Sequence, residues 1–82
     1  MKLPRDLSGH DLVKLLRRYG YEQTRQVGSH IRLQSTLRGQ PHYITVPDHD
    51  ELRPGTLNAI LSDVADYIGI ERSTIVDQLF GR

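Results

Sequence analysis

Gly28, Ser29 and His30 form the tripeptide with the clearest chemical potential in this sequence, because a histidine follows a glycine at the expected position of a turn. An imidazole has a pKa of about 6.5 in model peptides and exchanges protons at neutral pH. Arg25 and Arg32 flank the tripeptide, and guanidinium groups bind phosphate oxygens in a two-pronged manner. This set suits metal-free RNA cleavage, which needs two proton transfers and a cation that stabilises the phosphorane.

His30 is the candidate general acid or base of such a reaction. Gly28 lets the backbone turn and lets a ligand approach closely, while Ser29 offers a hydroxyl and an amide beside the ring. The second proton-transfer group is not evident; Tyr43 is one candidate, although packing or stacking is the more common role for its phenol. The simplest alternative is that His30 is a surface residue with no role.

The four histidines of the chain do not have the spacing of a metal site. The intervals from His30 to His42 and from His42 to His49 match no common zinc spacing. His49 with Asp48 and Asp50 would form only a weak, exposed cluster. No phosphate-binding loop, dinucleotide fingerprint or nucleophile elbow is present. We therefore expect neither a metal nor a cofactor.

Length and composition indicate one small domain over residues 1–82, too small to enclose a large cofactor in a deep pocket. The chain has no cysteine, which excludes disulfides and thiolate metal sites and fits a reducing compartment. Its first residues contain no apolar run typical of a signal peptide or a membrane span. These features predict a soluble, cytoplasmic protein without a membrane partner.

Charge is distributed unequally along the chain. Residues 1–47 carry eight Lys or Arg against three acids, a balance of +5, whereas residues 48–82 carry a balance of −4. The first half could therefore present a basic surface to a polyanion. Lys14, Arg17 and Arg18 are candidate RNA-binding residues of this half, although the dipole at a helix carboxyl end would also explain the two arginines. Two ordinary solvated faces remain the alternative.

Hydrophobic periodicity predicts a helix over residues 9–19, opened by a capping box at Ser8 and Asp11. Residues 21–27 alternate loosely and favour a strand, and Gly28-Ser29 forms a short turn before a second strand over 30–34. A third strand is expected over 43–46, ended by a proline.

Alternation assigns the side chains of these strands to two faces. Ile31 and Leu33 point into the core, so His30, Arg32 and Gln34 should point to solvent. By the same reasoning Tyr43 and Thr45 share that open face.

A strong amphipathic helix follows, from Pro54 to its end at Gly69, and residues 75–80 indicate a short third helix that packs back. The predicted fold class is α+β, with the order α-β-β-β-α, a three-stranded antiparallel sheet and a short C-terminal helix. The helices should cover one sheet face and leave the other partly open. This is the architecture of double-stranded RNA-binding domains.

An ordered set of segments resembles the HicA family of toxins from HicA–HicB toxin–antitoxin modules. The similarity spans roughly residues 7–70, and the set as a whole is specific although no single piece is diagnostic. The matching segments are Leu12-Val13-Lys14-Leu15-Leu16 through Gly20-Tyr21, Arg25-Gln26-Val27-Gly28-Ser29-His30, Thr45-Val46-Pro47, and Leu52-Arg53-Pro54-Gly55-Thr56-Leu57 with Ile60-Leu61.

This resemblance implies a ribosome-independent mRNA interferase that a separately encoded HicB partner inhibits. The catalytic histidine of the family falls on His30, with Gly28 and Ser29 at its companion positions. The chain departs from the family pattern in an acidic loop after Pro47, where relatives often carry basic residues. It departs again in its tail from Glu71 to Arg82, which is longer than that of the shortest members.

Two alternatives remain beside the endonuclease. A non-catalytic RNA-binding module of the same fold would bind RNA in a salt-sensitive manner without cutting it. A protein-interaction domain would use the open face or an edge strand only to dock a partner. For an inhibited toxin, we expect the antitoxin to cover the surface that bears His30.

Overall fold

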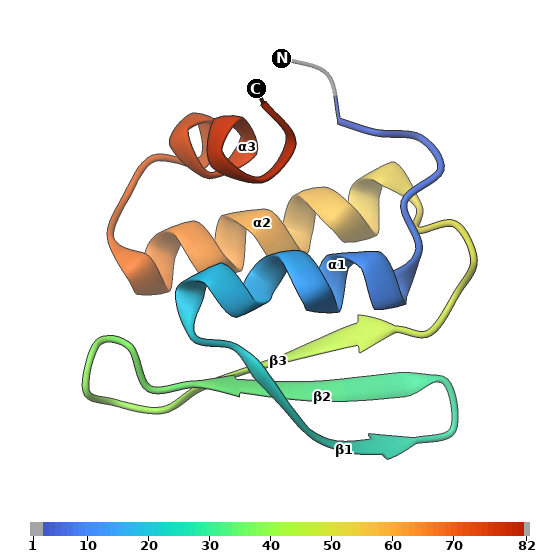
Figure 1. The fold of residues 1–82 in the computed structure, drawn as a ribbon, viewed down its shortest axis with the longest axis horizontal. Helices are drawn as coiled ribbons and strands as arrows, with labels where there is room; N and C mark the ends of the chain where they lie inside the picture. Colours follow the sequence, from blue (N-terminus) through green and yellow to red (C-terminus); the bar gives the residue numbers. More distant parts are fainter. Residues whose placement is uncertain (1–2, 82) are drawn as a thin grey trace.

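The structure, a computed structural model, describes residues 3–81 and has the predicted order of elements (Figure 1). It confirms the α+β class, with one three-stranded antiparallel sheet and a third helix at the carboxyl end. The elements are α1 (Gly9–Leu16), a 3-10 turn (Arg17–Tyr19), β1 (Glu22–Val27), β2 (His30–Ser35), β3 (His42–Pro47), α2 (Pro54–Ile68) and α3 (Arg72–Phe80).

The first helix begins at the predicted capping box. The Ser8 hydroxyl accepts a hydrogen bond from the Asp11 amide at 3.0 Å, and the Asp11 carboxylate accepts one from the Ser8 amide at 3.3 Å. The Ser8 amide and hydroxyl thereby hold the pKa of Asp11 below its usual value. Leu12, Val13 and Leu16 are buried on the inner side of the helix, so the apolar spacing in the sequence determines how α1 packs.

The sheet has the strand order β1-β2-β3, and the helices α1 and α2 lie over one of its faces (Figure 1). Its inner face forms the core together with these helices. The register pairs Ile31 with Val46 and Leu33 with Ile44, and all four side chains are buried. The alternation predicted for β2 and β3 is therefore confirmed.

Strand β1 differs from its neighbours because every residue from Glu22 to Val27 is exposed. It lies at the edge of the sheet, away from the helices (Figure 1). Its pairing with β2 also shifts between Gln23 and Arg25, as in a β-bulge. The aromatic residue that begins this segment, Tyr21, is fully buried just before the strand starts. Loose alternation in the sequence thus reflects an irregular edge strand.

The third helix packs on α2 and buries Ile75 and Val76, as the sequence predicts. The Arg18 guanidinium reaches this helix and donates a hydrogen bond to the Gln78 carbonyl at 3.0 Å. None of the helices within residues 3–81 has the length and apolar character needed to cross a membrane.

Candidate active site on the open sheet face

The sheet face opposite the helices carries its side chains in three cross-strand rows. Directly paired residues of an antiparallel sheet project to the same face. The residues paired with the outward-facing residues of β2 therefore also lie on the open face. The rows are Val27, His30 and Pro47; Arg25, Arg32 and Thr45; and Glu22, Gln34 and Tyr43.

His30 is exposed at the first position of β2. Its neighbour Ile31 and the next inward residue, Leu33, are fully buried, so the core fixes the direction in which the imidazole projects. Within residues 3–81 its side chain makes no hydrogen bond or ion pair. The ring is therefore accessible to a ligand from solvent.

Arg25 and Arg32 face each other across β1 and β2, in the row next to His30. Side chains paired in this way have Cβ atoms about 5 Å apart, and like charges in such a pair are destabilising. No carboxylate within the described residues forms an ion pair with either guanidinium. An anion bound between them would relieve the repulsion, which makes this pair the strongest candidate phosphate site on the face.

Tyr43 projects from β3 at the far end of the same face, where 60% of its surface is exposed. The Gln34 amide is 3.4 Å from its hydroxyl, and the ring itself stays uncovered. An exposed aromatic ring on the same face as two arginines suits base stacking. Tyr43 and His30 lie in the outer two of the three rows. Four residues along a strand correspond to roughly 13 Å, too far for both groups to act on one phosphate.

The turn before His30 consists of Gly28 and Ser29. Gly28 has a φ of +58°, whereas no residue other than glycine has a positive φ in the described chain. A positive φ at the first of two turn residues is the pattern of a type II′ hairpin, which favours glycine there. A Cβ on Gly28 would meet no atom within 4 Å. The backbone conformation, and not a lack of space, accounts for this glycine.

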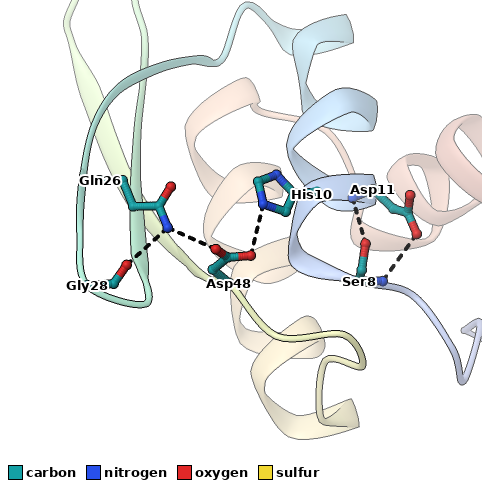
Figure 2. A network of polar contacts seen from close by, with 6 residues as sticks. All are labelled: Ser8, His10, Asp11, Gln26, Gly28 and Asp48. Carbon is teal, nitrogen blue, oxygen red and sulfur yellow. Dashed lines mark hydrogen bonds and ion pairs between the residues drawn. The ribbon is translucent and has the colours of Figure 1, made fainter.

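The side chains of His10, Gln26 and Asp48 form a polar network, which we call the turn clamp. It holds this hairpin against α1 and the loop after β3 (Figure 2). The Gln26 amide donates to the Gly28 carbonyl at 3.0 Å and to the Asp48 carboxylate at 2.9 Å. The other Asp48 carboxylate oxygen lies 2.9 Å from His10 Nε2. The Asp48 amide donates to the Ser29 carbonyl at 2.7 Å. The turn clamp therefore consists of His10, Gln26 and Asp48.

Sequence patterns did not identify the members of the turn clamp as parts of a site. Gln26 pairs with Ile31 and so belongs to the inner-facing register of β1. A glutamine at an inward position of an edge strand is one signal that could have indicated a polar contact beneath the sheet. Asp48 contacts a hairpin that is far from it in the sequence. Hydrophobic periodicity does not reveal a contact of this kind.

The predicted RNA-binding residues of the first helix do not share the face of His30. Lys14 lies on α1, and Arg17 and Arg18 lie on the 3-10 turn after it, all exposed in the layer that covers the inner sheet face. Arg18 also has its bond to α3. The candidate residues thus divide into one group on the open face and another in the helical layer.

The described residues contain no group of three or more His, Cys, Asp or Glu side chains that could hold a metal ion. His42 instead belongs to an aromatic cluster on the inner side of β3. Its Nδ1 is 2.6 Å from the Tyr21 hydroxyl, its ring stacks on Tyr67 with centroids 4.7 Å apart, and its Nε2 is 3.7 Å from the Asp63 carboxylate. Burial, reinforced by Tyr67 and Asp63, raises the pKa of the Tyr21 phenol.

Comparison with protein families connects this arrangement to known proteins. A family model described as "HicA toxin of bacterial toxin-antitoxin" matches residues 9–65. The chain belongs to the HicA toxin family. The matched region holds α1, the whole sheet and most of α2, and with them every candidate residue on the open face and in the turn clamp. No curated protein and no solved structure matches the chain significantly.

Family membership makes the protein a toxin of a toxin–antitoxin system, which implies a cognate antitoxin as its partner. The resemblance found in the sequence is thereby confirmed. The match ends within α2, so α3 lies outside the matched region.

Proposed function

We propose that this HicA toxin is a metal-independent RNA endonuclease that cleaves mRNA in the cytoplasm, with His30 as the group that transfers the proton. The observation that carries the proposal is the exposed imidazole of His30, without a partner among the described residues, beside the facing pair of Arg25 and Arg32. This arrangement supplies an acid or base and two phosphate-binding cations on one open surface, and the HicA family match gives the toxin context.

In the proposed reaction, neutral His30 takes the proton from a ribose 2′-hydroxyl. The 2′-oxygen then forms a bond to phosphorus while the bond from phosphorus to the 5′-oxygen breaks. The products are a 2′,3′-cyclic phosphate and a 5′-hydroxyl, and the exposed site leaves water to protonate the departing oxygen. Arg25 and Arg32 stabilise the charge of the phosphorane, because guanidinium groups bind equatorial phosphate oxygens well.

The substrate segment is single-stranded in this proposal. Tyr43 stacks a base at the far end of the face, since an aromatic ring binds any unpaired base through its π-face. Lys14, Arg17 and Arg18 would contact a second stretch of the RNA that passes around the exposed edge strand β1. Such phosphate contacts add affinity that depends on salt and not on sequence.

The antitoxin partner in this proposal is a HicB-like protein that covers the open face and the Gly28-Ser29-His30 turn. Blocking substrate access is the simplest way to inhibit a site that lies on an exposed surface. A structure of the complex should show His30 buried by the partner. An antitoxin bound only to α2 and α3, with His30 still exposed, would contradict this arrangement.

The function is tested by expression of the wild-type chain and of His30→Ala in a bacterial host without the antitoxin. The wild-type protein should arrest growth and cut mRNA, and the variant should do neither while it keeps its fold. Since removal of a general acid or base typically costs about 10²- to 10⁴-fold in rate, the difference should be large. RNA binding without scission by the wild-type protein would instead identify a non-catalytic RNA-binding module.

A further inference from the structure

Asp48 contacts the β1–β2 turn through both its backbone and its side chain. It follows the last residue of β3, and its amide donates to the Ser29 carbonyl at 2.7 Å. Its two carboxylate oxygens accept from Gln26 Nε2 and contact His10 Nε2, each at 2.9 Å. Both oxygens of the carboxylate therefore have a partner, although the side chain is 31% exposed (Figure 2).

The opposite end of the turn clamp is anchored in the helical layer. His10 lies in the first turn of α1, which the capping box fixes, and the amide of Gly9 donates to the His49 carbonyl at 2.9 Å. A Cβ on Gly9 would clash with the Pro47 carbonyl oxygen, so only glycine permits this close approach. The loop that carries Asp48 is thus held against α1 on one side and against the turn on the other.

Besides these contacts, the turn is held by strand pairing, of Val27 with His30 and of His30 with Pro47. Residues 22–30 are all exposed, and those of β1 lie at the edge of the sheet, away from the helices (Figure 1). A hairpin tip of this kind would move on the nanosecond timescale if it were free. A proton-transfer group must hold its position closely, since a misplacement of about 1 Å can cost about 100-fold in rate.

We propose that Asp48 is a positioning residue for His30: it locks the Gly28-Ser29 turn to α1 through Gln26 and His10, and so restrains the motion of the end of β2 that carries the imidazole. This inference rests on the proposed endonuclease function. It also explains why an acid follows Pro47, next to a surface that is proposed to bind negatively charged RNA.

The competing interpretation of Asp48 is purely electrostatic, and it predicts the opposite effect. A carboxylate near an RNA-binding face repels phosphates, so its removal should strengthen binding and lower KM. If Asp48 positions His30, its removal should mainly lower kcat, because the ladder of β1 and β2 still holds Arg25 opposite Arg32. The split between kcat and KM therefore separates the two interpretations.

The test compares Asp48→Ala and Asp48→Asn with Asp50→Asn, on a defined single-stranded RNA in the presence of EDTA. Asp50 is an exposed acid two residues away without a side-chain hydrogen bond or ion pair in the described structure, so its substitution controls for charge. We expect kcat to fall about 10- to 100-fold in Asp48→Ala, and less in Asp48→Asn, which keeps one acceptor oxygen. Asp50→Asn should keep the wild-type kcat.

A second measurement reads the position of the turn without RNA. In wild-type protein the NMR order parameters of the Ser29 and His30 amides should be about 0.85, and in Asp48→Ala they should approach about 0.6. Unchanged order parameters, or an unchanged kcat with a lower KM, would overturn the positioning role. A wild-type protein that cuts no RNA would contradict the proposed function alone, and the order parameters would still decide whether Asp48 holds the turn.

Discussion

His30 and His42 stand at the first positions of adjacent strands, yet their surroundings differ completely. His30 projects from the open face and has no side-chain partner in the described chain. His42 faces the helices, where it contacts the Tyr21 hydroxyl, the Tyr67 ring and the Asp63 carboxylate. Only 22% of the His42 side chain is exposed. The two residues therefore allow a direct comparison of a free imidazole with a packed one.

The packed histidine has the surroundings that resemble a catalytic relay, with a hydroxyl on one nitrogen and a carboxylate near the other. Tyr21 is fully buried, however, and burial raises the pKa of its phenol, so this hydroxyl can neither reach a substrate nor ionise easily. The cluster instead joins α2 to the sheet and to the β2–β3 loop, where the Tyr67 hydroxyl also accepts a hydrogen bond from the Arg38 amide at 3.0 Å. His42 has more polar neighbours, but His30 is the candidate catalyst because a substrate can reach it.

The largest effect beside that of removing His30 itself is expected from the paired arginines. Substitution of both Arg25 and Arg32 by Gln should lower kcat/KM for RNA cleavage by at least about 100-fold, because each hydrogen bond from a charged group contributes about 1.5–3 kcal/mol. The slope of log affinity against log salt should also fall, by about 0.7 for each phosphate that the protein no longer neutralises. The matched control, Lys14→Gln with Arg17→Gln, removes the same charge from the helical layer. An equal decrease of kcat/KM in the control would contradict the separate role of the open face.

His42→Ala should lower the free energy of unfolding by about 2–3 kcal/mol. The substitution leaves the buried Tyr21 hydroxyl without its partner and removes the stack on Tyr67. Urea denaturation of the two alanine variants measures the contrast, since His30→Ala should change stability by no more than about 0.5 kcal/mol, as is usual at exposed sites. Equal destabilisation by both substitutions would show that His30 also has a packing role.

Tyr43→Ala should raise KM for single-stranded RNA by about 10-fold with little change in kcat. Stacking of one base on an aromatic ring contributes roughly 1–3 kcal/mol, and the ring lies too far from His30 to take part in proton transfer. Tyr43→Phe keeps the ring and should keep the wild-type KM. A decrease of kcat in Tyr43→Phe would instead identify the phenol as the second acid or base.

The smallest effect concerns stability at alkaline pH. The pKa of Tyr21 is raised in the folded protein from its ordinary value of 10.0, so above about pH 10 the unfolded chain loses a proton that the folded protein keeps. Stability should therefore decrease as pH rises beyond that point. Tyr21→Phe should make this decrease shallower by at most about 1.4 kcal/mol per pH unit. The free energy of unfolding of each protein is measured between pH 9 and pH 11 and expressed relative to its value at pH 7. Equal slopes of this free energy against pH in wild type and Tyr21→Phe would contradict the raised pKa of the Tyr21 phenol.

The sequence was sufficient to predict the fold class and the face on which His30 lies. Strict alternation around Ile31 and Leu33, and the apolar spacing of α2, depend only on local periodicity. The contacts of Asp48 and the aromatic cluster of His42 could not be predicted in this way, because each joins segments far apart in the chain. The separation of Lys14, Arg17 and Arg18 from the open face likewise depends on which sheet face the first helix covers.

The most direct test of the central claim is the single-turnover rate of cleavage of one defined RNA, in EDTA, by equal amounts of folded wild-type protein, His30→Ala and His42→Ala. Measurements should be made at a temperature well below the melting transition of each protein. The account predicts that His30→Ala loses about 10²- to 10⁴-fold in rate, while His42→Ala stays within about threefold of wild type. A His30→Ala protein that cleaves at the wild-type rate, or a decrease confined to His42→Ala, would contradict it.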